Sequence, residues 1–310
     1  MLHVFSVPVA LLAALLFFLP AHADDTVRFG ILSVLDTLPL QVAEHDGLFD
    51  AQGLDVELVP FASAMERDVA LQAGRLDGYF GDLIAALLLL EQGQPMPVAL
   101  VSYRTTPGQP MFGLTLSPAR AGQKLDALRG ATVGYSRSTI MEYLLDKMLN
   151  NNGLAADFFE RTEVKKIPIR LQMLLSDQLD TALLPEPLLS LARLKGGQTF
   201  LTAENLAIPL TVLCLHEKYY TGDAAPIHKF LAAYREALLR LRKTPEHYRA
   251  LMAETCRIPG PLVDRFPIYA YPDPALPTYE EVGDVQDWMI GKGMLKARLP
   301  YNTVIAPLIP

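Results

Sequence analysis

Polar side chains stand where an apolar run of strand length gives way to a helical pattern. Asp36 and Thr37 follow the run 27–33 and precede a helical spacing that starts at Pro39. A helix N-terminus offers unpaired N–H groups and the positive end of the helix dipole, so polar groups beside it can bind a ligand. We therefore predict ligand contacts for Ser33, Asp36 and Thr37. Asp36 or Thr37 could instead simply cap the helix.

A second polar segment lies between a predicted strand, which ends at Tyr135, and a predicted helix. Thr139 and Glu142 have the spacing of a capping box, and that local role is sufficient for both. Ser136 and Ser138 remain as hydrogen-bond donors with exposed backbone N–H groups beside them. We predict that Ser136, Ser138 and Thr139 contact a ligand.

Two carboxylates and an aromatic ring complete the candidates. Glu186 lies between two prolines, which restrict its backbone and fix the direction of its carboxylate. It could contact an amine, amidine or aromatic N–H group of a ligand, or act as an acid at a helix N-terminus. Asp82 could contact the ligand or cap the next helix. Tyr103 could stack on a planar ligand or pack in the core. Arg170 could contact a ligand, or it could be a solvated residue in the first turn of a helix, which we favour.

The residue pattern predicts no catalytic residue, no metal site and no cofactor. The six histidines are scattered without HxxxH or HxH spacing, and we find no triad or phosphate-binding loop. The two cysteines, Cys214 and Cys256, could form a disulfide in an exported protein or remain buried thiols. The sequence leaves that choice open.

Composition bounds the partners and the compartment. The 310 residues carry 27 Lys and Arg against 34 Asp and Glu, a net charge of −7 that disfavours nucleic acid as a partner. The apolar run 9–19 is too short to span a bilayer, and Ala21-His22-Ala23 follows it. This pattern predicts a signal peptide over residues 1–23, cleaved after Ala23, a periplasmic location and no membrane insertion after cleavage. The uncharged start of the signal leaves the true start codon open.

Strand-like and helix-like segments alternate along the chain, including a predicted strand at 163–167, which favours an α/β fold with parallel sheets. A short internal repeat suggests two equivalent halves, because 71–77 (LQAGRLD) is similar to 174–180 (LLSDQLD). Each copy leads into a short strand and then an acidic group, Asp82 or Glu186. Ligands of open α/β sheets bind at the carboxyl ends of strands, so two such lobes would form a cleft.

Several segments resemble the type II periplasmic substrate-binding proteins of ABC transporters, nearest to their nitrate/sulfonate/taurine and thiamine-precursor (NMT1/THI5-like) group. Residues 39–56 resemble the opening motif P-x-x-x-A-x-x-x-G-x-F … G-L-x-V of that group. Residues 128–134 resemble its L-[KR]-G-K-x-[IV]-[AG] motif at the entry to the second lobe. Residues 71–78 and 182–187 complete the match, which covers nearly all of the chain after the signal.

The resemblance implies a two-lobed periplasmic-binding-protein type II fold, with parallel-sheet lobes joined by a two-segment hinge. Lobe 1 would comprise residues 24–105 and 208–310, and lobe 2 residues 110–205. The hinge would lie near 105–110 and 205–210. In that family, the loop that contains Ser136 contacts the ligand from lobe 2.

The resemblance also implies a function. We expect a monomeric, non-enzymatic solute-binding protein that captures a small molecule between its lobes and delivers it to an ABC permease with its ATPase. The expected ligand is a small anionic or N-containing compound, similar to a sulfonate, nitrate or thiamine pyrimidine. An exported enzyme on the same fold and a sensory module that docks on a membrane receptor are the alternatives.

Overall fold

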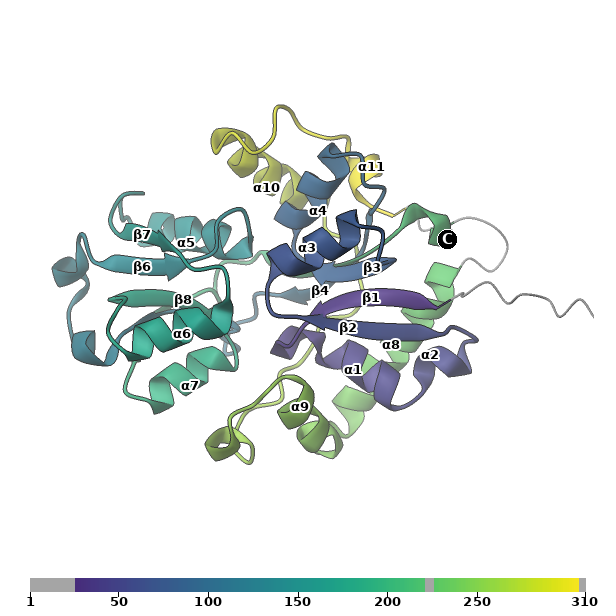
Figure 1. Ribbon diagram of the computed structural model, residues 1–310, viewed down its shortest axis with the longest axis horizontal. Helices are drawn as coiled ribbons and strands as arrows, with labels where there is room; N and C mark the ends of the chain where they lie inside the picture. Colours follow the sequence, from purple (N-terminus) through teal and green to yellow (C-terminus); the bar gives the residue numbers. More distant parts are fainter. Residues whose placement is uncertain (1–25, 221–225, 307–310) are drawn as a thin grey trace, which may run out of the picture.

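The computed structural model describes residues 26–220 and 226–306, which build two five-stranded sheets side by side (Figure 1). The predicted signal peptide lies outside these residues. The first sheet has the order β2-β1-β3-β10-β4 and consists of β1 (Val27–Leu32), β2 (Val56–Phe61), β3 (Gly78–Gly81), β4 (Val98–Arg104) and β10 (Pro209–Leu215). The second has the order β7-β6-β8-β5-β9 and consists of β5 (Phe112–Leu116), β6 (Thr132–Tyr135), β7 (Glu160–Glu163), β8 (Thr181–Pro185) and β9 (Gln198–Thr202).

Each sheet contains one antiparallel strand, which amends the prediction of parallel-sheet lobes. In the first sheet β10 runs antiparallel to β3 and β4, and in the second β5 runs antiparallel to β8 and β9. Both are the first strands that the chain enters after it crosses from the other sheet. The parallel strands point their carboxyl ends toward the neighbouring lobe, so a segment arriving from that lobe enters its new sheet in the opposite direction.

The two crossing segments lie side by side, as expected for a two-segment hinge. They connect β4 to β5 and β9 to β10. Hydrogen bonds join them: the Thr105 N–H donates to the Ile208 carbonyl at 3.0 Å, the Ile208 N–H donates to Thr105 Oγ1 at 2.9 Å, and the Gly108 N–H donates to Glu204 Oε2 at 2.8 Å. The strands of the two sheets fall on either side of the lobe boundaries implied by the resemblance, and we keep those boundaries as a prediction.

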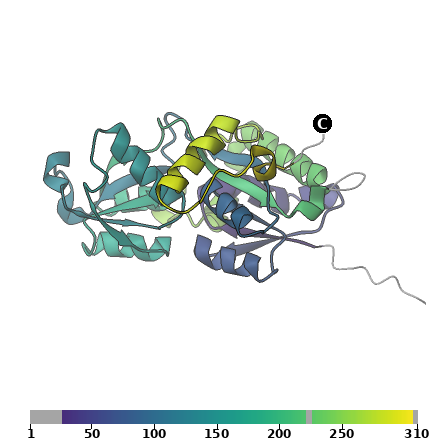
Figure 2. The same cartoon turned by 90° about the horizontal axis from the view of Figure 1, so that it is seen from above.

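Helices cover both faces of each sheet, and the apolar strands between them form the core (Figures 1 and 2). Those of the first sheet are α1 (Leu38–His45), α2 (Leu48–Ala51), α3 (Ala64–Gln72), α4 (Leu83–Glu91), α8 (Pro226–Lys243), α9 (Arg249–Thr255), α10 (Tyr279–Gly291) and α11 (Tyr301–Val304). Those of the second sheet are α5 (Ile140–Asn151), α6 (Ile167–Leu175) and α7 (Leu188–Leu194). Within the described ranges, no helix has the length and apolar character needed to cross a bilayer.

The prediction of a strand at 163–167 is wrong. The strand β7 ends at Glu163, and α6 already begins at Ile167. Pro168 occupies the first turn of α6, where its missing N–H is no loss. Ile167, the last residue of the predicted strand, is therefore the first residue of a helix.

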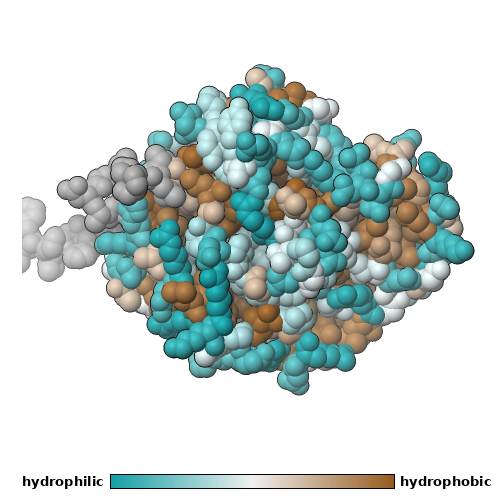
Figure 3. Space-filling view, turned by 180° about the vertical axis from the view of Figure 1, so that it is seen from behind, coloured by the Kyte–Doolittle hydropathy of each residue, from teal (hydrophilic) through white to brown (hydrophobic). Residues whose placement is uncertain are grey.

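The surface seen from behind is mixed. Hydrophobic residues appear there as separate patches between hydrophilic ones (Figure 3). Such scattered apolar residues are normal for a surface that faces water. Both cysteines, Cys214 and Cys256, are free and buried, which answers the question that the sequence left open.

Candidate functional site

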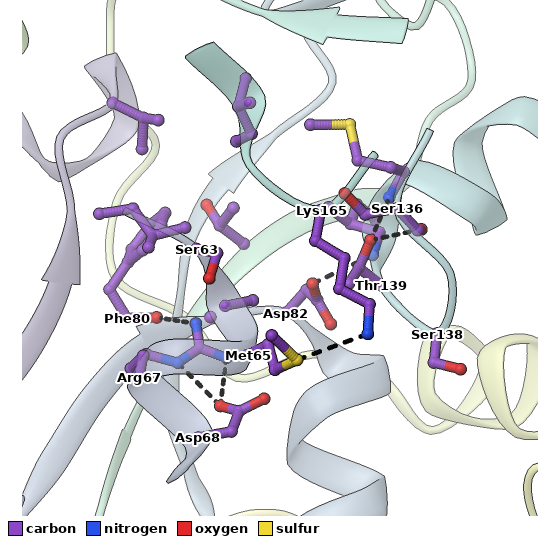
Figure 4. A pocket seen from close by; sticks show the side chains of 18 of the residues that line it. Ser63, Met65, Arg67, Asp68, Phe80, Asp82, Ser136, Ser138, Thr139 and Lys165 are labelled. Carbon is purple, nitrogen blue, oxygen red and sulfur yellow. Dashed lines mark hydrogen bonds and ion pairs between the residues drawn. The ribbon is translucent and has the colours of Figure 1, made fainter. Parts of the chain in front are cut away.

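A cavity of about 550 Å³ lies between the two sheets and is lined from both. Arg67 and Asp82 line it from the side of the first sheet, and Ser136 and Lys165 from the side of the second (Figure 4). Asp36 also lines it from the side of the first sheet. The volume falls within the range of small-molecule sites. The carboxyl ends of β1 and β3, and of β6 in the other sheet, lead directly into lining residues, as the rule for open α/β sheets predicts.

Arg67 forms the first wall together with a carboxylate of its own lobe. Its side chain is 1% exposed. Nε and Nη2 donate to Asp68 Oδ1 at 2.9 and 2.6 Å, and Nη1 donates to the Phe80 carbonyl. Burial alone would lower the pKa of Arg67, but the neighbouring Asp68 carboxylate and the Tyr79 ring at 4.7 Å outweigh it, and the pKa is raised. This cation is therefore neutralised inside the wall.

Arg170 lies behind the second wall, outside the lining residues, and has no carboxylate partner among the described residues. Its side chain is 0% exposed, so the expectation of a solvated residue is wrong. Nη1 donates to the Leu183 carbonyl at 2.9 Å, and Nη2 donates to the Val164 carbonyl at 2.7 Å and to Ser136 Oγ. Burial lowers the pKa of Arg170 to about 9, so the guanidinium stays charged at neutral pH. Ser136 lies on the cavity surface and accepts from this guanidinium, so the charge of Arg170 polarises a hydroxyl of the cleft.

The two arginines occupy equivalent positions in the weak sequence repeat. Each stands four residues before a repeated segment, at 71–77 or 174–180. Each donates Nη1 to a strand carbonyl, of Phe80 in β3 or Leu183 in β8. The similarity that the sequence shows only faintly is therefore present in the side-chain packing.

Asp82 bridges the two walls. Its Oδ1 accepts from the Ala85 N–H at 2.9 Å and caps α4, and its Oδ2 accepts from the Ile140 N–H at 3.0 Å, at the start of α5 in the other lobe. Burial raises the pKa of Asp82, although both N–H groups oppose that shift. Capping and a place on the cavity wall, offered as alternatives by the sequence, are combined in one carboxylate.

Among the carboxylates that line the cavity, Asp36 has the fewest polar partners to offset its loss of hydration. It is 3% exposed, and its Oδ2 has no hydrogen-bond partner among the described residues. Burial raises the pKa of Asp36 from its ordinary 3.8 to about 6, against the smaller opposing effect of a hydrogen bond from Thr211. A buried carboxylate of this kind is costly unless a donor or cation meets it.

Five of the nine predicted ligand contacts line the cavity, and four do not. Those on the lining are Asp36, Asp82, Ser136, Ser138 and Thr139. The structure places Ser33, Thr37, Tyr103 and Glu186 outside the lining residues. The ligand contacts of all nine remain a prediction.

The four outlying residues have local roles. Thr37 donates Oγ1 to the Val34 carbonyl at 2.7 Å, and Ser33 is half-buried. Tyr103 is fully buried and packs edge-on against Tyr271, which is its core-packing alternative. Glu186 is buried and accepts from the N–H and the hydroxyl of Ser190 at 2.9 and 2.8 Å, which is its alternative as an acid near a helix start.

Two capping predictions are also corrected. Neither Asp36 nor Thr37 caps its helix through a side-chain hydrogen bond. Thr139 does cap α5, through the Met141 N–H, but Glu142 accepts from the Ser138 N–H rather than closing the box on Thr139.

The structure adds polar lining residues that the sequence reasoning missed, among them Ser63, Arg67 and Lys165. Ser63 caps α3 by accepting from the Glu66 N–H, and Lys165 lies against Met65 of the opposite lobe with an Nζ–Sδ distance of 3.5 Å (Figure 4). Extending the repeat by four residues toward the N-terminus would have found Arg67. Nothing local in the sequence marks Lys165.

Comparison with known proteins places this geometry in context. A sequence model of the NMT1-like family matches residues 21–257, whereas no curated protein matches the chain. The alkanesulfonate-binding protein of Xanthomonas axonopodis pv. citri, bound to MOPS, is similar with a TM-score of 0.75 and 16% identity over 91% of this chain and 98% of that one.

Two further solved structures are similar. The periplasmic aliphatic sulphonate binding protein of Escherichia coli has a TM-score of 0.72 and 18% identity over 91% of this chain and 92% of its own. The ligand-binding component of an ABC-type import system from Staphylococcus aureus, with zinc bound, has a TM-score of 0.72 and 14% identity over 91% and 97%. At these identities the likeness shows the fold, which confirms the two-lobed prediction.

Proposed function

The chain belongs to the NMT1-like family, and from this premise we propose that it is an extracytoplasmic solute-binding protein. It captures a small molecule in the cleft between its sheets and delivers it to an ABC permease with its ATPase. The observation that carries this proposal is the cavity of about 550 Å³ between two sheets that are joined by a two-segment crossing. Rotation about such a crossing opens and closes a cleft around a ligand.

The structural neighbours support this role. Two of them are named as sulfonate-binding proteins, and the third is a component of an import system. On this basis the ligand is a small anionic or N-containing compound. The predicted signal peptide at residues 1–23 accounts for export to the periplasm.

The chemistry of the cleft favours binding over catalysis. A serine nucleophile needs a base to take its proton. Ser136 instead accepts a hydrogen bond from Arg170, which is a donor only. Among the described residues that line the cavity there is no histidine or cysteine. We therefore propose that the bound compound leaves unchanged.

The single tryptophan, Trp288, is suited to report on the cleft. It lies on α10, downstream of the second crossing, and its Nε1 donates to Asp146 Oδ2 of α5 in the other lobe at 2.8 Å. Its ring also meets Tyr143 of α5 edge-on at 5.3 Å. Movement of one lobe against the other changes these surroundings, and with them the fluorescence of Trp288.

The test is a ligand screen by thermal shift, with Trp288 fluorescence as the second readout. A ligand that binds only the folded state raises the melting temperature. We expect at least one small amine, pyrimidine or sulfonate to raise it and to change the fluorescence saturably. Ala64→Phe, which places a ring on the cavity wall, should abolish both effects, while Leu239→Phe on the exposed face of α8 should not. A screen in which none of these compounds acts contradicts the proposal, as does turnover of the bound compound.

A further inference from the structure

Two places where this cleft could hold an anion, the Arg67 guanidinium and the start of α5, are already bonded to the protein's own groups, while the exposed cations Arg137 and Lys165 also line the cavity. The guanidinium of Arg67 is paired with Asp68. At the start of α5, the Ile140 N–H donates to Asp82, the Ser138 N–H to Glu142 and the Met141 N–H to Thr139. A helix N-terminus attracts anions through such free N–H groups and the helix dipole. Here a carboxylate of the opposite lobe fills that position.

Among the described residues that line the cavity, the buried polar group left without a hydrogen-bond partner is an acceptor. Asp36 Oδ2 is buried, lines the cavity wall and has no hydrogen-bond partner among the described residues. Thr211, beside it on the lining, accepts from Ser102 at 2.9 Å, and its own hydroxyl lowers the pKa of Asp36 without outweighing burial. A carboxylate in this setting is best satisfied by a ligand that brings a cation or several N–H donors. The raised pKa of Asp36 is the expected consequence of that missing partner.

The opposite wall presents a donor. Ser136 Oγ accepts from the Arg170 guanidinium, so one of its lone pairs is in use and its proton is free to donate toward the cavity. The adjacent charge polarises this hydroxyl, which strengthens it as a donor. The first wall therefore offers an acceptor at Asp36, and the second offers a donor at Ser136.

We propose that the cleft selects a small solute with a cationic or N–H-rich group, such as an amine, an amidine or an aromatic N–H, which donates to Asp36, and an acceptor atom that faces Ser136. A sulfonate beside Asp36 would be repelled, and a sulfonate at the start of α5 would have to displace Asp82, so both positions disfavour that ligand class. This inference rests on the proposed function. It separates the protein from the neighbours that are named as sulfonate-binding.

The test compares probes that share a phenyl ring but differ in charge. Benzamidine and benzylamine carry a cation, whereas phenylmethanesulfonate and benzoate carry an anion. Ligand-observed NMR titrations into the full-length protein at neutral pH give a dissociation constant for each. We expect both cations to bind at least tenfold more tightly than both anions.

Two variants test whether Asp36 causes the preference for cationic probes. Asp36→Asn should weaken benzamidine binding at least tenfold. Asp126→Asn is the control, because Asp126 is an exposed carboxylate that lies outside the lining residues. It should leave benzamidine affinity within about twofold. Equal losses in the two variants would show a general electrostatic effect and overturn the assignment to Asp36. If Asp36→Asn fails to fold, the ranking of probes on the unmodified protein decides.

The outcomes separate this inference from the proposed function. Tighter binding of phenylmethanesulfonate than of benzamidine would overturn the ligand class and leave the solute-binding role intact. If no probe binds and the wider screen also finds no ligand, the inference falls together with the proposed function. Preferential binding of the cations, lost in Asp36→Asn alone, supports the inference.

Discussion

One arginine lines the first wall of the cleft and another lies behind its second wall, at equivalent positions but in opposite electrostatic settings. Arg67 is bonded to a carboxylate that follows it directly, Asp68, whereas Leu171 stands at the corresponding position after Arg170. Arg170 is left with two backbone carbonyls and the Ser136 hydroxyl. The residue that follows each arginine therefore makes the difference. Asp68 neutralises Arg67 within its own lobe, whereas Arg170, followed by Leu171, keeps its charge and bonds the Ser136 hydroxyl of the cavity.

The difference shows how a repeated framework produces an asymmetric site. Both arginines fix the helix that carries them to a strand carbonyl, and that structural task needs no particular charge partner. Asp68 neutralises the charge of Arg67 in the first wall. The carboxylate of Asp36, whose Oδ2 has no partner among the described residues, is then the prominent polar group of that wall. Arg170 makes the second wall a donor through Ser136. The account predicts a ligand held between an acceptor and a donor.

The largest expected effect concerns Asp36 and pH. Its pKa in the folded protein is about 6 against an ordinary 3.8, so the protonated form is favoured by folding. This contribution to stability is complete below pH 3.8 and is lost as the pH rises through 6. Asp36→Asn escapes that loss, and above pH 7 it should be more stable than the unmodified protein by about 3 kcal/mol.

Urea unfolding of both proteins between pH 4 and pH 8 measures this difference. The gap should shrink toward pH 4, because both proteins then carry an uncharged group at position 36. A gap that is constant across this range would mean that Asp36 already has a partner for its charge, and the contrast between the walls would be lost.

The second effect concerns the donor wall. Ser136→Ala removes the hydroxyl that Arg170 polarises, and we expect the affinity for the best solute of the screen to fall about tenfold, or about 1.4 kcal/mol. Isothermal titration calorimetry measures it. Ser117→Ala is a control, because Ser117 is also buried but lies outside the lining residues. Similar affinities for Ser136→Ala and the unmodified protein would remove the donor from the account.

A third variant tests whether the carboxylate after Arg67 makes the walls different. Asp68→Asn leaves the Arg67 charge without its ion-pair partner, so the first wall becomes more positive. The affinity for phenylmethanesulfonate should rise by a few-fold, and that for benzamidine should fall, in the NMR titrations described above. Unchanged affinities for both probes would show that Asp68 does not set the character of this wall.

The smallest effects belong to a pair of sites where the two lobes remain alike. Asp77 binds Lys218, and its repeat equivalent Asp180 binds Arg120, at 2.6 and 2.8 Å, and all four side chains are partly exposed. Exposed ion pairs contribute little to stability. Lys218→Met and Arg120→Met should each lower the free energy of unfolding by less than about 1 kcal/mol. A much larger loss in one of them would extend the asymmetry beyond the cleft.

The sequence predicts the fold better than it predicts the site. Strands and helices follow from apolar periodicity, which reflects burial on one face and is visible along the chain. Asp82 was found because a carboxylate before an apolar helix is a local pattern. Its bond to Ile140 of the other lobe has no local pattern, because it depends on how the lobes meet.

The outlying candidates show the same limit. Glu186 and Tyr103 have the residue types and strand-end positions of ligand contacts, yet one bonds within its own helix start and the other packs into the core. The sequence marks the end of a strand but not the direction of the side chain there. Arg67 and Arg170 are charged residues on helices, which are usually solvated, and only the packing of each helix on its sheet buries them.

A crystal structure of the protein soaked with benzamidine tests the central claim most directly. The account predicts the amidinium in the cavity between the lobes, with a nitrogen about 2.7–3.2 Å from Asp36 Oδ2. Benzamidine bound outside this cavity, or bound within it with Asp36 Oδ2 still unpartnered, would contradict the account.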